Sequence, residues 1–266
     1  MLITDREEYD IIASLGGTCS AAGQLRHRGK RPYSLPLDWT LMLDDRPIRA
    51  LPELIKTRFK NFSLPENMEE YEPPQNEYGE IRYHLTDKLT GYNFIHQYSV
   101  LPGNQKEFMK QRSVLMRRVD RFYKLMESAK HALFVLNTAF PYDANLLIPV
   151  YEAMKDTFPD VEIEIAAMQF SADSNRTATL GGGKVKVDFI QRHLDIVYDN
   201  QFTAPEWRWM DRLKIAGLPL PTELRKKNMA VKFAYKIWRW LGKYLEHKCA
   251  GCASMRWRNF KKYKLR

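Results

Sequence analysis

The stretch that most constrains the fold lies near the beginning of the chain, where an apolar run meets two glycines and a cysteine. Residues 9–15 (YDIIASL) are mostly apolar and are followed at once by Gly16 and Gly17. A short apolar run that ends at glycines is typical of a buried strand followed by a turn. Thr18 can cap a helix and Gly29 can end one, so a helix is predicted over residues 19–27. A strand, a glycine turn and a helix in this order are the usual opening of a parallel α/β sheet.

The same alternation of strand and helix returns later in the chain. The sequence predicts an α/β fold with a largely parallel central sheet flanked by helices, and a C-terminal basic amphipathic helical extension. Residues 66–80 are acidic and rich in turn residues, so an exposed excursion is expected there, and three glycines at 181–183 predict a hairpin turn. The other expected elements are helices over 50–60, 104–129 and 145–158, and strands over 92–100, 131–137, 161–169 and 184–190.

The positive charge of the chain is concentrated at its C-terminal end. The formal net charge is +10, but residues 222–266 hold 14 Lys or Arg and two acidic residues, which gives that segment +12 and leaves −2 for residues 1–221. A nearly neutral body argues against nucleic acid as a partner, because a basic stripe on the folded domain is expected for that class. We therefore predict an α/β catalytic or binding domain over 1–221 and a basic amphipathic helical tail over 222–266.

The composition of the predicted tail indicates the kind of surface on which the protein docks. A basic helix with interleaved aromatic residues suits an anionic membrane surface, where aromatic rings lie at the interface and Lys and Arg meet phosphates. Two alternatives stay open: the apolar stripe packs on the body, or the tail contacts a nucleic-acid backbone. The predicted membrane-contact residues are Lys232, Lys236, Trp238, Arg239, Trp240 and Lys243.

Cysteine usage and the N-terminus favour a cytoplasmic protein, with a peripheral position on the inner membrane if the tail binds lipid. Three cysteines are too few for a disulfide framework, the start MLITDREEYD does not resemble a signal peptide, and no run of about 18 apolar residues occurs. His247, Cys249 and Cys252 have metal-like spacing, but a structural zinc site normally needs four ligands. No metal and no cofactor are predicted.

Cys19 is the strongest candidate for chemistry. It lies in the first turn of the predicted helix, where unpaired N–H groups and the helix dipole stabilise a thiolate and depress a thiol pKa. The N–H groups near Thr18, Cys19 and Ser20 could also form an oxyanion hole during acyl transfer. The alternative is a small buried thiol that packs under the sheet.

A nucleophilic cysteine needs a base, and His96 is the best candidate. It lies in the aromatic run YNFIHQY, which could fix its ring, although a half-buried structural histidine fits the same context. His84 and His193 are weaker alternatives. Asp38, next to Trp39, could orient the histidine or bind substrate, or it could serve only as a turn residue.

Two further features could hold an anion. Gly16 and Gly17 could cradle phosphate through backbone N–H groups, but they match no phosphate-binding fingerprint. The predicted helix over 104–129 carries an arginine-rich face that could recognise an anionic ligand, or could simply be solvated. The arginines are Arg112, Arg117, Arg118 and Arg121.

The motifs around Cys19 resemble a known family. The string DIIASLGGTCSAA, followed by Arg31 and then PLDW at 36–39, resembles the SLGxxC…PFDW opening of a bacterial domain family of unknown function whose members are described as papain-like cysteine peptidases. Looser similarities run to about residue 140, and they place His96 in an xHDF-like segment. The chain has Leu37 in place of the usual Phe and Gln97 in place of the usual Asp, which removes a carboxylate beside the predicted base.

The resemblance implies a cysteine-dependent, papain-like acyl hydrolase or transferase, with Cys19 as nucleophile, His96 as general base and Asp38 as orienter. Substrate or phosphate contacts are predicted at Gly16, Gly17, Thr18, Ser20, Arg31 and Trp39. Families of this kind resemble neighbours of bacterial surface-polysaccharide genes, which implies a link to cell-surface polysaccharide metabolism. The expected substrate is a glycan, a peptide or a nucleotide sugar. One alternative is a membrane-surface glycosyltransferase that uses a nucleotide sugar for cell-envelope glycan synthesis; another is a non-catalytic binding module.

Overall fold

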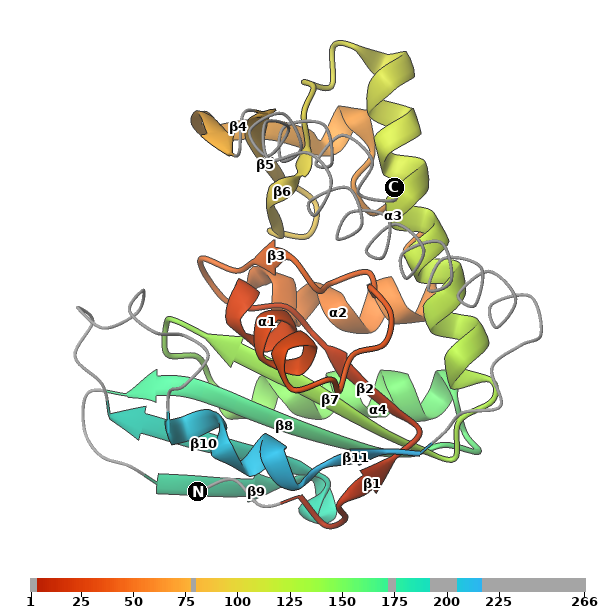
Figure 1. Ribbon diagram of the computed structural model, residues 1–266, viewed down its shortest axis with the longest axis vertical. Helices are drawn as coiled ribbons and strands as arrows, with labels where there is room; N and C mark the ends of the chain where they lie inside the picture. Colours follow the sequence, from red (N-terminus) through yellow and green to blue (C-terminus); the bar gives the residue numbers. More distant parts are fainter. Residues whose placement is uncertain (1–3, 78–79, 172–175, 192–204, 217–266) are drawn as a thin grey trace, which may run out of the picture. The chain divides into compact units, whose positions relative to one another are not determined.

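The computed structural model describes residues 4–77, 80–171, 176–191 and 205–216. These residues form a mixed α/β fold with three sheets, as Figure 1 shows. The predicted helical tail, the membrane-contact residues within it and His193 lie outside the described residues. The boundary between body and tail therefore stays a prediction.

The largest sheet has five strands, and its strand order is β2-β7-β8-β10-β9. The pairs β2–β7, β7–β8 and β8–β10 are parallel, whereas β10 and β9 are antiparallel. The hairpin turn predicted at the three glycines is confirmed: they form the short 3₁₀ turn η3 (Gly181–Gly183) between β9 and β10. The strands are β2 (Ile11–Ser14), β7 (His131–Thr138), β8 (Glu162–Ser171), β9 (Arg176–Leu180) and β10 (Val185–Gln191).

A four-stranded antiparallel sheet with the order β3-β6-β5-β4 was not expected from the sequence. The turn-rich excursion predicted for residues 66–80 is wrong in its backbone, because most of that stretch forms β4 and pairs with β5, although Glu66, Glu69 and Glu70 are exposed as expected. The predicted α/β class is confirmed, but the largely parallel sheet is not, because the five-stranded sheet is mixed and this second sheet is antiparallel. The strands are β3 (Thr40–Leu41), β4 (Met68–Glu77), β5 (Glu80–Asp87) and β6 (Asn93–Tyr98).

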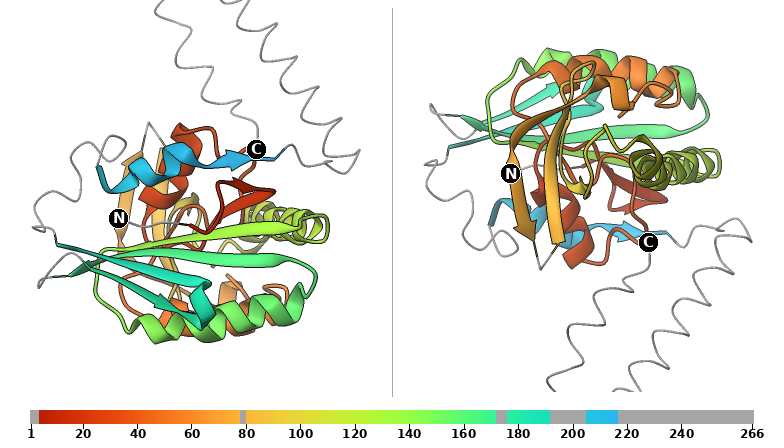
Figure 2. Two further views of the ribbon diagram at one scale, coloured as in Figure 1. Left: turned by 90° about the horizontal axis from the view of Figure 1, so that it is seen from below. Right: turned by 90° about the horizontal axis from the view of Figure 1, so that it is seen from above.

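The helices cover the five-stranded sheet on both faces (Figure 2). One face packs against α1 and the 3₁₀ segment η5 through a buried cluster that includes Leu25, Leu133 and Trp209. On the other face lies α4, against which α2 packs. The remaining elements are α1 (Cys19–His27), α2 (Arg46–Lys56), α3 (Gln105–Met126), α4 (Leu147–Thr157), η1 (Pro65–Asn67), η2 (Ala144–Leu146), η5 (Pro205–Arg212), and the parallel pair β1 (Glu8–Tyr9) and β11 (Lys214–Ile215).

The long helix α3 connects the two larger sheets. Near its start, Phe108 stacks on Tyr98 of β6 with ring centroids 4.4 Å apart, and near its end Phe122 meets Phe134 of β7 at 6.1 Å. Aromatic pairs of this kind add to the stabilisation that burial itself provides. The two pairs anchor α3 to the antiparallel sheet near its start and to the five-stranded sheet near its end.

Candidate functional site

The turn between β2 and α1 is closely packed, and this explains both of its glycines. Gly16 and Gly17 have φ values of +91° and +96°, which residues with a side chain rarely adopt. A Cβ on Gly16 would lie 2.6 Å from the Thr40 hydroxyl, and one on Gly17 would lie 2.0 Å from the Asn137 carbonyl oxygen. The N–H of Gly16 donates to Ser14 Oγ at 3.0 Å. These contacts account for the glycines by packing and do not favour the predicted phosphate cradle.

Cys19 is the first residue of α1, as the sequence predicted. Thr18 caps the helix, because its hydroxyl oxygen accepts from the N–H of Ser20 at 3.3 Å and from Asn137 Nδ2 at 3.1 Å. The second bond ties the cap to β7, so the position of the first helical turn is fixed by the sheet. Cys19 itself is half-buried, and the dipole of α1 places partial positive charge at this end of the helix.

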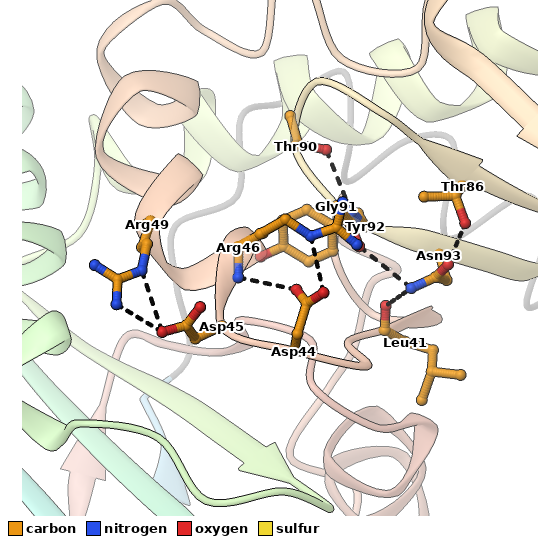
Figure 3. Close-up of polar contacts among 10 residues, drawn as sticks. All are labelled: Leu41, Asp44, Asp45, Arg46, Arg49, Thr86, Thr90, Gly91, Tyr92 and Asn93. Carbon is orange, nitrogen blue, oxygen red and sulfur yellow. Dashed lines mark hydrogen bonds and ion pairs between the residues drawn. The ribbon is translucent and has the colours of Figure 1, made fainter.

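The antiparallel sheet holds the glycine turn from the opposite side. Met42, just after β3, donates from its N–H to the carbonyl oxygen of Gly17 at 2.9 Å, and the buried Tyr92 donates from its hydroxyl to the carbonyl oxygen of Leu15 at 3.0 Å. Figure 3 shows how Asn93 then joins β3 to the turn before β6, since its Nδ2 donates to the carbonyl oxygens of Leu41 and Gly91 at 3.3 and 3.2 Å. The strand that carries His96 is thus built onto the turn that carries Cys19.

His96 is exposed on β6 and contacts Trp39 through an edge-to-face arrangement, with ring centroids 6.3 Å apart and planes at 84°. Trp39 also lies under the guanidinium of Arg31, whose central carbon is 5.1 Å from the ring centroid. The structure therefore brings together three predicted site residues, His96, Trp39 and Arg31. Their pairing with Cys19 stays a prediction.

Asp38 is fully buried and forms an ion pair with Arg31. The same carboxylate oxygen accepts from the backbone N–H of Leu35 at 2.7 Å, so Asp38 also closes the turn before it. Burial raises the pKa of the Asp38 carboxyl above its ordinary value, because it disfavours the charged form, and the guanidinium of Arg31 opposes that rise. Asp38 thus positions Arg31 and the loop that ends at Trp39.

The arginines of α3 fasten the helix to neighbouring loops, which the sequence did not show. Arg112 donates to the carbonyl oxygens of Phe62 and Lys60, both at 3.0 Å. Arg118 donates to the side-chain oxygen of Gln97 at 3.1 Å, and Arg121 donates to the carbonyl oxygen of Ser34 at 2.7 Å; the exposed Arg117 donates to Ser113 on the same helix at 3.2 Å. The spacing of the arginines gave no indication of this role. Most of the acceptors are backbone carbonyl oxygens, which every residue has, so the sequence does not reveal them.

The alternative base His84 has a different setting. It is buried on β5, where its Nδ1 lies 3.0 Å from a Glu72 carboxylate oxygen and its ring stacks on Tyr71 at 5.8 Å. These contacts join β5 to β4 within the hairpin. Among the described residues no group of three or more His, Cys, Asp or Glu could hold a metal ion.

The fold and the turn together define a class: a mixed α/β protein in which a buried strand leads through a glycine turn to a cysteine at the first position of a helix. Residues 10–171 match a protein family described as "putative papain-like cysteine peptidase". The match covers more than half of the chain, so this protein belongs to that family, and the resemblance seen in the sequence is confirmed. Neither a curated protein nor a solved structure matches the chain. In the part of the chain that the structure describes, no helix is long and apolar enough to cross a membrane.

Proposed function

We propose that this protein is a cysteine-dependent acyl hydrolase or transferase with Cys19 as its nucleophile. The observation that carries the proposal is the position of Cys19, half-buried at the first residue of α1 and held by a cap that is bonded to the sheet. A helix N-terminus favours the thiolate, which is the reactive form of cysteine. Membership of a family described as papain-like cysteine peptidases supports the same chemistry.

The proposed reaction has two stages. In the first, the Cys19 sulfur attacks the acyl carbon, the bond to the leaving group breaks, and the leaving group takes a proton from His96. In the second, water or an acceptor hydroxyl gives its proton to His96 and attacks the thioester, which releases Cys19 as thiolate. The N–H of Ser20 is engaged by Thr18, so in this scheme other N–H groups of the first helical turn stabilise the oxyanion.

Trp39 and Asp38 are positioning residues in this scheme. The edge-to-face contact with Trp39 restricts the exposed His96 ring, and Arg31, held by Asp38, lies over the same indole. Loss of Trp39 should therefore act through His96. A Trp39→Leu variant is expected to lower turnover and to shift its pH profile, whereas Trp39→Phe should restore most of both.

The test combines labelling with turnover. In a Cys249→Ser/Cys252→Ser background, iodoacetamide should label Cys19 at neutral pH, and His96→Gln should slow the labelling. Hydrolysis of p-nitrophenyl acetate should be lost in Cys19→Ala, while the melting temperature changes little. Retained turnover in Cys19→Ala would refute the proposal. Stabilisation by a nucleotide sugar such as UDP-glucose, together with that result, would favour the glycosyltransferase alternative.

A further inference from the structure

Three guanidinium groups gather around one buried carboxylate beside the predicted base. Arg31 is ion-paired with Asp38, and the charges of Arg118 and Arg121 lie close enough to Asp38 to interact with it. The spacing of three residues places Arg118 and Arg121 on one face of α3. We name Arg31, Arg118 and Arg121 the arginine cluster.

The other partners of the arginine cluster are neutral. Arg118 donates to the amide oxygen of Gln97 at 3.1 Å, and Arg121 donates to the carbonyl oxygen of Ser34 at 2.7 Å. With one carboxylate for three guanidinium groups, the cluster carries a surplus of two positive charges within the described residues. An amide or carbonyl oxygen satisfies a donor but does not compensate that surplus.

Burial makes the surplus positive charge of the arginine cluster costly, and some N–H donors of the cluster have no partner in the described part of the chain. The side chain of Arg31 is 6% exposed, and burial lowers the pKa values of Arg118 and Arg121 because it disfavours their charged forms. Arginine nevertheless remains charged in proteins. The Nε atoms of Arg31 and Arg121 and one oxygen of Asp38 are buried without a hydrogen-bond partner among the described residues. Uncompensated buried charge destabilises a fold unless a counter-charge pairs with it.

Two arginines of the cluster are partly exposed, and the cluster adjoins the proposed site. Arg118 and Arg121 are half-buried, as is Trp39, which contacts both Arg31 and the exposed His96. An anionic group bound at the cluster would therefore lie beside the proposed general base.

From this arrangement we infer that the arginine cluster binds an oxyanion group, a carboxylate or a phosphate, carried by the acyl substrate. Guanidinium groups suit both, because their paired N–H donors match the oxygen geometry of either group. The inference rests on the proposed function for its link to the acyl substrate, but the binding of the anion can be measured without turnover.

Anion binding is tested first, by thermal unfolding of the full chain in inorganic phosphate and in acetate at matched ionic strength. The anion that fits should raise the melting temperature by about 2–4 °C at a concentration well above its dissociation constant. The increase should vanish in Arg118→Gln and in Arg121→Gln and persist in Arg117→Gln, the control on the same helix. Equal increases in wild type and all three variants, or none in wild type with either anion, would overturn the inference.

The second test compares two reagents at Cys19, in the Cys249→Ser/Cys252→Ser background. Iodoacetate is anionic and iodoacetamide is neutral, so their rate ratio reports the local charge. The ratio of the iodoacetate rate to the iodoacetamide rate should fall several-fold in Arg118→Gln. In wild type, added phosphate should slow labelling by iodoacetate more than labelling by iodoacetamide. This second comparison does not depend on the folding of any arginine variant. An unchanged ratio with normal iodoacetamide labelling would refute the link to the substrate while the cysteine proposal stands. A phosphate effect that disappears in Arg118→Gln, with Cys19 unreactive to both reagents, would support the anion site and refute the cysteine proposal.

Discussion

Asp38 and Arg31 form an ion pair in which both side chains are almost entirely withdrawn from water, 0% and 6% exposed. A buried pair of this kind adds little compared with apolar residues of the same shape, but breaking it leaves one charge uncompensated. The pair also fixes the loop before β3 and the guanidinium above Trp39. Its disruption should therefore affect both stability and the proposed site.

Arg31→Met is expected to lower the free energy of unfolding by about 3–5 kcal/mol, because the buried Asp38 carboxylate loses its directly paired guanidinium, and Arg118 and Arg121 donate to other partners. The matched control is Arg49→Gln, which removes the exposed partner of Asp45 at 2.7 Å (Figure 3). That change should cost at most about 1 kcal/mol. Urea denaturation of both variants measures the difference, and similar losses in the two would contradict the importance of burial at Asp38.

The raised pKa of Asp38 predicts a pH dependence. Because burial favours the protonated carboxyl, the contribution of Asp38 to stability is fully present below its unfolded value of 3.8 and is lost as pH rises through the higher folded-state pKa. Asp38→Asn cannot titrate. The free energy of unfolding of wild type relative to Asp38→Asn should therefore fall as the pH is raised above 3.8, as measured by urea denaturation at a series of pH values. A relative stability that rises over that range would show that Arg31 outweighs desolvation.

The glycine turn gives a steric prediction. Gly17→Ala places a methyl group 2.0 Å from the carbonyl oxygen of Asn137 at a φ of +96°, so the backbone of the turn must move. We expect a loss of more than about 3 kcal/mol and slower alkylation of Cys19, whose helix begins at this turn. Gly103→Ala is the control, because a Cβ there meets no atom within 4 Å. It should change stability by less than about 1 kcal/mol; equal effects of the two substitutions would rule out close packing as the reason for Gly17.

Tyr92 connects the antiparallel sheet to the cysteine turn through one buried hydrogen bond. Tyr92→Phe removes the hydroxyl that donates to the carbonyl oxygen of Leu15, and burial already raises the pKa of that hydroxyl well above its usual value. The expected loss is about 1–2 kcal/mol, with turnover reduced but present. Calorimetry and p-nitrophenyl acetate hydrolysis test both parts. A fully active variant with unchanged stability would show that the bond does not hold the turn.

The sequence was most informative where local chemistry determines structure. The apolar run, the two glycines and the capping threonine near Cys19 predicted β2 and α1, and the helix bounds 19–27 match. Helix α2 begins at Arg46, earlier than expected, because Pro47 is well suited to the first turn of a helix and that signal was overlooked.

The prediction failed where long-range pairing determines structure. Glutamates and prolines in residues 66–80 resemble a loop, yet β4 lies at the edge of its sheet, where charged side chains and proline are tolerated. The role of Arg118 and Arg121 was equally hidden, since it depends on which loops fold against α3. Spacing alone placed both arginines on a helix but gave no indication that they gather around Asp38.

The basic tail remains a proposal for membrane docking, and charge substitution in the full chain tests it without truncation. Sedimentation with vesicles of phosphatidylcholine and phosphatidylglycerol should recover wild type, and neutral phosphatidylcholine vesicles should not. Replacing Lys232, Lys236 and Lys243 with Gln should weaken binding by about 1 kcal/mol for each charge removed. The control replaces Lys56, Lys110 and Lys124 of the body with Gln, which removes the same charge at other positions. Equal losses in the two triple variants would show that net charge matters and the tail does not, and undiminished binding in the tail variant would remove the proposal.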